Sequence, residues 1–506
     1  MPILARPAVV WTCVLYLLLV VGIGIWAARR TRDGRDFFIA GQSLGLVVTA
    51  LATMSAAFSG FFFIGGPGLA YDIGLASLFI CAPVSFTAGL LCWSVGKRLR
   101  LLSEVREVYT IPDAVLARYG SRRAAGLAAV AVLAGTVAYL GAQLQALGVV
   151  IESAFGTREI FGEASLAAAM ALGLVVVLFY SVAGGMIAGV YTDLLQGTLM
   201  VAAAIGVFVA ALRSGGGLAA TSERISAHEG FGPSFLDPLG NVPVATAVGF
   251  FFIFAVGTLG QPHMLHKFYM LEDPRKLRWM PLVLGGSQTL CVLVWLGIGL
   301  AVPSLVAAGR LAPLADPDQA APLFLLHFAP ELLAGLVFAG ILAAIMSTVD
   351  SFVNIGAAAL VRDLPRALGW RLPSQLGWGR GAVIGIACAA AFLAYLWGDL
   401  IALLGTFAFS TFGAALAPAL AVGLNWKRVP ARAASASIAT GLVLNLALEL
   451  FARQTWFPSW PRPPLPPGVL PGAVALAASF CVLFALSWAS RGEEPLPADV
   501  AAVLDC

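Results

Sequence analysis

The sequence predicts an all-α polytopic membrane protein with about thirteen transmembrane helices. Of its 506 residues, 60% are hydrophobic and only 11% are charged, whereas soluble proteins have roughly 25% charged residues. The apolar residues fall into runs of about 20, which are long enough to cross the hydrocarbon core of a bilayer. The expected spans are residues 8–28, 45–66, 76–96, 124–150, 164–184, 193–212, 243–262, 280–307, 332–358, 380–398, 400–424, 432–452 and 471–490.

Basic residues predict the orientation of these spans. If the N-terminus lies outside, 23 of the 30 Lys and Arg residues fall on inner segments and 7 on outer segments, in agreement with the positive-inside rule. The first run is followed by Arg29, Arg30 and Arg32, a stop-transfer pattern, so we expect a retained span rather than a signal peptide. The sequence thus predicts a multi-pass protein of the cell inner (plasma) membrane, with the N-terminus outside and the C-terminus cytoplasmic.

Glycine and proline interrupt two of the spans. In SAAFSGFFFIGGPGLAY (55–71), the cluster at 65–68 disfavours a continuous helix. Because the charge pattern puts Asp72 at the outer surface, that cluster can in part end the span there, and we expect the functional break further upstream, at Ser55–Gly60. In GFFFIFAVGTLGQPHMLH (249–266), the interruption falls at Gly257–Pro262. Interrupted spans in corresponding places, five spans apart, are typical of transporters built from inverted repeats.

This spacing predicts the organisation of the chain. The expected segments are an N-terminal flanking span (1–35), a first inverted repeat of five spans (36–213), an outer loop (214–241), a second repeat of five spans (242–424), two flanking spans joined by a Pro-rich outer loop (425–490) and a cytoplasmic tail (491–506). None of these segments has room for a soluble signalling domain.

Several function classes do not fit the sequence. The seven Cys and four His residues have no metal-ligand spacing, and we find no nucleophile–base set and no phosphate-binding loop. We therefore expect a protein that is not an enzyme, has no organic cofactor and does not bind nucleic acid. The expected partners are the lipid bilayer and small solutes.

Four passages carry a resemblance to a known family. They are FFIAGQSLG (37–45) leading into SGFFFIGGPGLAY (59–71), YSVAGGMIAGVYTDLLQG (180–197), GTLGQPHMLHKF (257–268) and AGILAAIMSTVDSFVNIGAAALVRDL (339–364). Over residues 8–490 the chain resembles the sodium:solute symporter family, and in GQPH it most resembles the proline permeases and, less closely, the pantothenate permeases. The resemblance implies a LeuT-like fold of five-plus-five inverted repeats with discontinuous first helices. It also implies sodium-coupled import of a small organic solute, an amino acid such as proline or a carboxylate, by alternating access.

The ninth span offers a cation site. Ala344, Ser347 and Thr348 are spaced i, i+3 and i+4, so they share one helix face, and two hydroxyls with one carbonyl provide neutral oxygen ligands. Ser and Thr in membrane helices more often bond to their own backbone or to a neighbouring helix. The resemblance implies that these three residues bind Na⁺ together with the carbonyls of Ser55 and Phe58.

Asp193 has two interpretations. It is either an acid at a helix N-terminus, where the dipole favours it, or an intramembrane acid with a function. In the second case it lies on the sodium exit path or forms a second sodium site with Asp350 and Ser351. Asp350 could equally pair with a basic group or with Asn354.

The solute is expected between the two interruptions. Its candidate contacts are Gly60, Phe61, Phe63, Pro67, Phe254, Thr258, Gln261 and Pro262. Compared with the proline permeases, this chain has Ala57 in place of an acid, and Phe254 and Thr258 in place of Trp and Tyr. Two alternatives to sodium symport remain open: a solute sensor or non-transporting subunit that retains the fold, and proton-coupled uptake.

Overall fold

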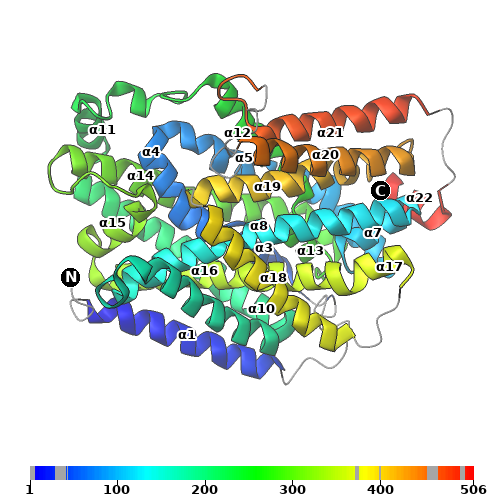
Figure 1. The fold of residues 1–506 in the computed structure, drawn as a ribbon, viewed down its shortest axis with the longest axis horizontal. Helices are drawn as coiled ribbons and strands as arrows, with labels where there is room; N and C mark the ends of the chain where they lie inside the picture. The colour runs from blue at the N-terminus through cyan, green and yellow to red at the C-terminus, as the bar shows by residue number, and fades with distance from the viewer. Residues whose placement is uncertain are drawn as a thin grey trace.

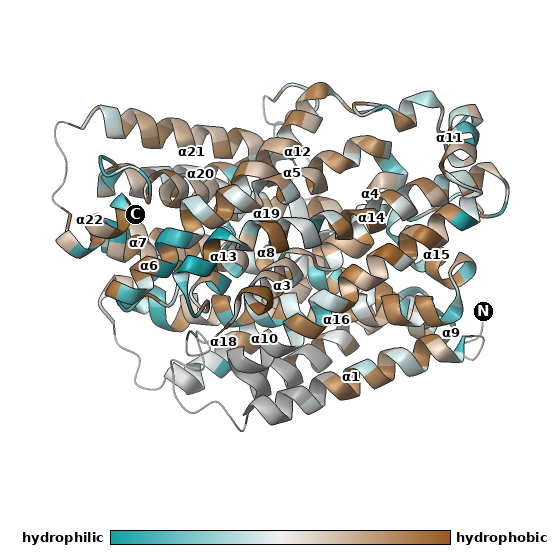
Figure 2. Cartoon of the chain, turned by 180° about the vertical axis from the view of Figure 1, so that it is seen from behind, coloured by the Kyte–Doolittle hydropathy of each residue, from teal (hydrophilic) through white to brown (hydrophobic). Residues whose placement is uncertain are grey.

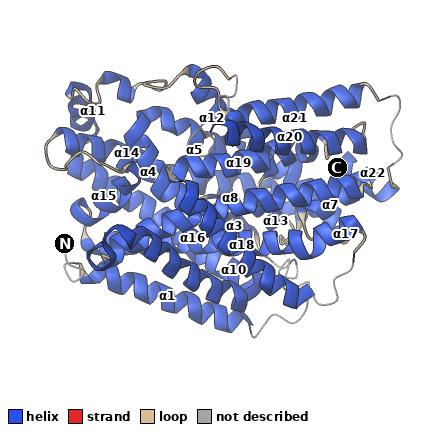
Figure 3. Cartoon of the chain, viewed as in Figure 1, coloured by secondary structure: helices blue, strands red, loops and turns tan. Residues whose placement is uncertain are grey.

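The structure, a computed structural model, describes residues 6–28, 42, 44–370, 375–397, 400–452, 465–490 and 496–506. In these residues every extended regular element is a helix (Figure 3). Most helices run along the long axis of the molecule, and the two chain termini lie at its opposite ends (Figure 1). Hydrophilic residues gather towards the two ends, and the middle is mainly hydrophobic (Figure 2). This distribution is the one expected of a bundle that crosses a bilayer.

Within the described residues, nine helical segments are long and apolar enough to cross a membrane, or ten if one bent pair counts as a single span. The expected count of thirteen is therefore not confirmed. One reason is that a single helical stretch, Phe61–Val105, covers parts of two expected spans. The basic cluster at 29–35, the Pro-rich segment 457–464 and Arg491 lie outside the described residues.

The N-terminal half contains one flanking helix followed by the expected first repeat. Its helices are α1 (Pro7–Ala28), α3 (Leu46–Ala57), α4 (Gly66–Ile73), α5 (Leu78–Leu90), α6 (Lys97–Val105), α7 (Ile111–Tyr119), α8 (Arg122–Phe155), α9 (Arg158–Phe161), α10 (Ser165–Gly215) and α11 (Leu218–Ala227). The helix α10 includes both expected spans 164–184 and 193–212, and its 51 residues exceed the roughly 20 that one crossing needs. The boundary expected between these spans is therefore not a break in the helix. Within the passage 180–197, the side chains of 180–191 are not described.

The first discontinuity lies upstream of the Gly-Pro cluster. Helix α3 ends at Ala57, and Phe58 has an extended backbone (φ −101°, ψ 99°). A π-helical turn at Phe61–Gly65 then leads into α4. Pro67 lies just after this turn, six residues into the helical stretch that begins at Phe61, and it lacks the N–H that a residue inside a helix normally donates. The break at 58–60 therefore agrees with the upstream position expected from the charge pattern, and residues 65–68 are helical.

The C-terminal half contains the expected second repeat and the last flanking helices. They are α12 (Val244–Val256), α13 (Pro262–Phe268), α14 (Met280–Ala307), α15 (Ala320–Phe328), α16 (Glu331–Ala358), α17 (Leu364–Leu368), α18 (Gln375–Trp397), α19 (Ile401–Ala417), α20 (Ala431–Ala452), α21 (Pro471–Trp488) and α22 (Ala498–Asp505). Between α12 and α13, a 3₁₀ turn at Gly257–Gly260 and an extended Gln261 bend the pair by 43°. Both discontinuities that the sequence predicts are therefore present.

The C-terminal helix α22 is attached to the same end of the bundle as α6. Arg106 Nη2 donates to Asp499 Oδ1 at 2.8 Å, and Lys427 forms an ion pair with Asp505. Val500 on α22 is fully buried. The tail is thus packed against the segments that contain Arg106 and Lys427, with exposed ion pairs around a small apolar contact.

Candidate functional site

The first break is fixed by side chains of α8. The Gly60 N–H donates to Gln143 Oε1 at 3.0 Å, and the Ser59 hydroxyl lies 3.4 Å from the Tyr139 hydroxyl. A buried backbone N–H without a partner would cost free energy, so Gln143 replaces the helical acceptor that the break removes. A Cβ on Gly60 would lie 2.5 Å from Ala146 Cβ and 2.7 Å from Ile345 Cγ1. The backbone at Gly60 is therefore packed closely between α8 and α16.

This contact brings the break beside the polar face expected on α16, since Ile345 is flanked by Ala344. The Thr348 hydroxyl donates to the Ala344 carbonyl at 2.8 Å, which is the ordinary local bond of Thr in a helix. The Thr348 oxygen keeps its lone pairs for a cation. On α3, Ser55 Oγ is buried and has no hydrogen-bond partner among the described residues. A buried hydroxyl without a partner is an exception among buried polar groups.

Asp193 forms a buried ion pair. Its Oδ2 lies 2.8 Å from Lys267 Nζ, and the side chains of Lys267 and Asp193 are 2% and 1% exposed. At an effective dielectric constant of about 20, this separation corresponds to a Coulomb attraction on the order of 6 kcal/mol, against a desolvation cost of several kcal/mol for each of the two charges. The Ser347 hydroxyl donates to Asp193 Oδ1, and Lys267 Nζ lies 3.5 Å from Ser351 Oγ.

Lys267 corrects one part of the charge analysis. Lys267 is one of the 23 basic residues that the charge pattern assigns to inner segments, but its side chain is buried one turn after the second break, on α13. A buried intramembrane acid such as Asp193 needs a partner, and this requirement was the signal in the sequence for a nearby base. Asp350 has its expected amide neighbour, because Asn354 Nδ2 donates to Asp350 Oδ1 at 3.2 Å.

The second break is held by Gln261 and α19. Gln261 Nε2 donates to the carbonyls of Gly257 at 3.0 Å and Phe409 at 2.9 Å. A Cβ on Gly260 would lie 2.6 Å from the Ala417 amide nitrogen, so only glycine allows this approach. The Thr258 hydroxyl donates to the Phe254 carbonyl within its own helix. The backbone of this break is thus braced against α19 as the first break is braced against α8.

A narrow apolar cavity lies between the two breaks. It is lined by Ala57, Phe58, Phe61, Phe62, Ile80, Cys81, Val84, Phe254, Met264 and Phe409. The Phe254 ring stacks on Phe409 with centroids 4.5 Å apart and on Phe61 with centroids 5.8 Å apart. Its free space admits about one water molecule, so an organic solute requires the aromatic rings to move.

The structure places only part of the expected solute set around this cavity. Phe61 and Phe254 line it. The lining does not include Gly60, Phe63, Pro67, Thr258, Gln261 or Pro262. Phe58 and Phe409 line it but were not among the expected solute contacts. Phe409 comes from a helix remote in sequence, and no local pattern marks its approach to Phe254.

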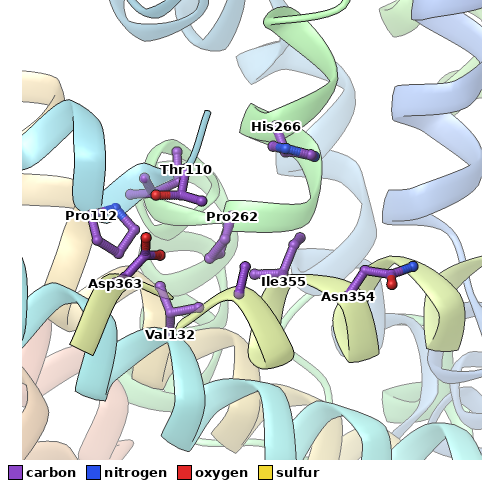
Figure 4. Close-up of a pocket in the computed structure, with 10 residues that line it drawn as sticks. Thr110, Pro112, Val132, Pro262, His266, Asn354, Ile355 and Asp363 are labelled. Carbon is purple, nitrogen blue, oxygen red and sulfur yellow. The ribbon is translucent and has the colours of Figure 1, made fainter. Parts of the chain in front are cut away.

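A second cavity lies beside α13, and Pro262 lines it. Figure 4 shows Pro262 and His266 on α13 facing Asn354 and Ile355 on α16, with Thr110 and Asp363 at the other side. Close to this cavity, Asp113 pairs with Arg362 at 2.7 Å and with Arg366 at 2.9 Å. These ion pairs join α7 to the two helical segments that follow α16, the π-helical turn at Ala359–Asp363 and α17. The cavity therefore lies between the second break and a charged end of the bundle.

Some of the buried polar atoms without partners lie in or beside the two breaks. Among the described residues, these atoms include Ser55 Oγ, Gln143 Nε2, Gln261 Oε1 and both ring nitrogens of His263. Most buried polar atoms in proteins are hydrogen-bonded, so each exception calls for an explanation. Four such residues lie in or beside the two interruptions, and others, such as Gln288 and Asp318, lie elsewhere in the described chain.

Comparison with known proteins agrees with this geometry. A profile of the Sodium:solute symporter family matches residues 37–441. The osmoregulated proline transporter OpuE of Bacillus subtilis is 29% identical over 441 residues, covering 84% of this chain and 86% of the relative. The sodium/proline symporter of Haemophilus influenzae is 28% identical, covering 88% and 89%, and the sodium/pantothenate symporter of the same organism is 25% identical, covering 88% and 92%.

Solved structures show the same fold. A Na⁺-coupled sialic acid symporter in a substrate-bound, outward-open state has a TM-score of 0.76 at 16% identity, covering 97% of this chain and 99% of that chain. MhsT, in complex with L-phenylalanine, has a TM-score of 0.51 at 14% identity, covering 87% of this chain and 98% of that chain. The fold is thus the LeuT-like inverted repeat with discontinuous first helices. Since the family profile matches most of the sequence, this chain belongs to the sodium:solute symporter family, whose members are membrane transporters and not enzymes.

Proposed function

We propose that this protein is a sodium-coupled symporter that imports a small amino acid or carboxylate by alternating access. The observation that supports the proposal most is the presence of unsatisfied buried polar atoms in or beside the two helix breaks, next to an apolar cavity and a hydroxyl-bearing helix face. Discontinuous helices present unpaired backbone groups to ions and to charged ends of solutes. Cargo that enters this region gains hydrogen bonds that the protein alone does not make.

The proposed sodium site consists of Ser55 and Phe58 on the first broken helix with Ala344, Ser347 and Thr348 on α16. The packing of Gly60 against Ile345 supports it, because this contact joins the two halves. Bound sodium would therefore tie the first broken helix to α16. An ion held between these two elements favours the conformations in which they are close.

The proposed solute has a carboxylate and a small apolar body. The cavity lining contains no charged side chain, so the charge of a solute must be balanced by backbone groups and amides at the breaks. Proline and pantothenate, which the names of relatives mention, both carry a carboxylate. The stacked rings of Phe61, Phe254 and Phe409 suit an apolar ring or short chain.

We also propose that the N-terminus lies outside and the C-terminus in the cytoplasm, and that the first repeat is residues 36–213 and the second is residues 242–424. The location of the termini at opposite ends of the bundle supports an odd number of crossings (Figure 1). In this orientation, the cavity beside His266 and Asp363 lies on the cytoplasmic side of the second break. It would form part of the exit route for the solute.

One sodium ion per cycle supplies enough energy for uptake. A ten-fold gradient contributes about 1.4 kcal/mol and a membrane potential of about 100 mV adds about 2.3 kcal/mol, which together support accumulation of several hundred-fold. The solute can be identified by measuring the thermal stability of the purified protein with a panel of amino acids and monocarboxylates. The true solute is expected to stabilise the protein more in sodium than in choline. Binding of a solute that liposomes containing the protein never take up would instead indicate a sensor.

A further inference from the structure

Lys267 places a positive charge where a second sodium ion would otherwise bind. The second site expected from the sequence uses Asp193 and Ser351, with Asp350 nearby. In the structure, Lys267 Nζ lies 2.8 Å from Asp193 Oδ2 and 3.5 Å from Ser351 Oγ. Its ammonium therefore contacts two of the three expected ligands and brings a full positive charge into a buried site.

A sodium ion cannot share this position with the ammonium. Two positive charges at hydrogen-bonding distance repel strongly in a buried site, and the single carboxylate of Asp193 compensates only one of them. The other oxygen of Asp193, Oδ1, already accepts from the Ser347 hydroxyl. Both oxygens of the carboxylate are thus engaged by groups of this chain.

The ion pair also orients Ser347, an expected ligand of the first sodium. A hydroxyl has one proton to donate and two lone pairs. Because Ser347 donates its proton to Asp193, the lone pairs of its oxygen remain available to a cation. The pair between Lys267 and Asp193 therefore positions a ligand of one cation site while occupying the other.

We propose that Lys267 is a built-in cation that fills the second cation position at Asp193 and Ser351, so that this protein binds and couples one sodium ion per cycle. This inference rests on the proposed sodium coupling and adds its stoichiometry. The identity of residue 267 then decides how many ions are used. A neutral residue here would open the second position to sodium.

The experiment compares the purified wild type with three variants: Lys267→Met, Lys267→Arg, and the double variant Lys267→Met/Asp193→Asn. Bound ²²Na⁺ per protein is counted in detergent without solute, and thermal stability is measured against sodium concentration with choline as the balancing salt. The arginine variant keeps the charge. The double variant removes both charges and leaves no carboxylate to attract a second ion.

We expect one bound ion for the wild type, the Lys267→Arg variant and the double variant. We expect two bound ions for Lys267→Met, with a Hill coefficient that rises from about 1 towards about 2, since the Hill coefficient is limited by the number of sites. The Lys267→Met variant is also expected to be less stable than the wild type in choline and to recover in sodium, because the second ion replaces the missing charge.

Two results would overturn the inference. One is a wild type that binds two ions. The other is a Lys267→Met protein that binds only one ion, or that is stabilised by sodium no more than the double variant is. Loss of folding of Lys267→Met in sodium as well as in choline counts as the second result. Failure of the wild type to bind any sodium would instead refute the proposed sodium coupling itself.

Discussion

Replacing Gln143 by Leu tests whether the first break is a binding element. Gln143 Oε1 accepts the Gly60 N–H at 3.0 Å, and both groups are buried. Leucine has a similar size but no acceptor, so the N–H would lose its partner at a cost of about 1–3 kcal/mol. If sodium binds the carbonyls next to this amide, their displacement is expected to raise the half-saturating sodium concentration by roughly 5- to 150-fold.

The helix α8 provides a matched control. Gln145 lies two residues further along α8, and its Nε2 donates to the Ala394 carbonyl at 2.9 Å, away from the break. The Gln145→Leu variant also removes an amide from α8, so it tests general destabilisation. Sodium dependence of solute-free thermal stability and of solute uptake is measured for both variants. If Gln143→Leu and Gln145→Leu have the same half-saturating sodium concentration, the first break is not a sodium-binding element.

Three further predictions concern the cation site, the buried acid Asp318 and the tail. Thr348→Ala is expected to raise the sodium concentration for half-maximal uptake far more than Thr348→Ser, which keeps the hydroxyl; equal values would exclude Thr348 as a ligand. Burial raises the pKa of Asp318 to about 7, although its carboxylate accepts from the Ile401 N–H at 2.9 Å. The protonated acid is therefore favoured in the folded protein, and the free energy of unfolding should fall by up to about 4 kcal/mol as pH rises from about 4 through 7. If the melting temperature of Asp318→Asn falls with pH as steeply as that of the wild type, this assignment is wrong. The exposed pair of Arg106 and Asp499 should be screened in about 1 M salt, so proteolysis of α22 is expected to accelerate there in the wild type, but hardly in Asp499→Asn, which already lacks the pair.

The sequence predicts the helical fold and both discontinuities because these depend on local properties. Apolar runs, basic loops and Gly or Pro at a helix end act over a few residues. The charge pattern also places the first break correctly, upstream of Pro67. What the sequence does not reveal is lateral packing. Gln143 is more than 80 residues from Gly60, and nothing in its neighbourhood shows that it faces a broken helix.

The ion-pair partner of Lys267 likewise cannot be predicted from the sequence. Counting basic residues places Lys267 in an inner segment, because it follows an apolar run as loop lysines do. Only the tertiary structure brings it within 2.8 Å of Asp193, 74 residues earlier in the chain. The residues that line the apolar cavity are the hardest to predict, because Phe58, Phe254 and Phe409 come from the first break, α12 and α19, and aromatic residues are common throughout this sequence.

Uptake of radiolabelled L-proline, and of any solute found by thermal stabilisation, into liposomes containing the purified protein shows whether sodium drives solute import. We expect accumulation above the external concentration only with an inward sodium gradient, and we expect it to collapse when a sodium ionophore removes that gradient. Accumulation of the same solute in sodium-free buffer, driven by a proton gradient or by none, would contradict this expectation.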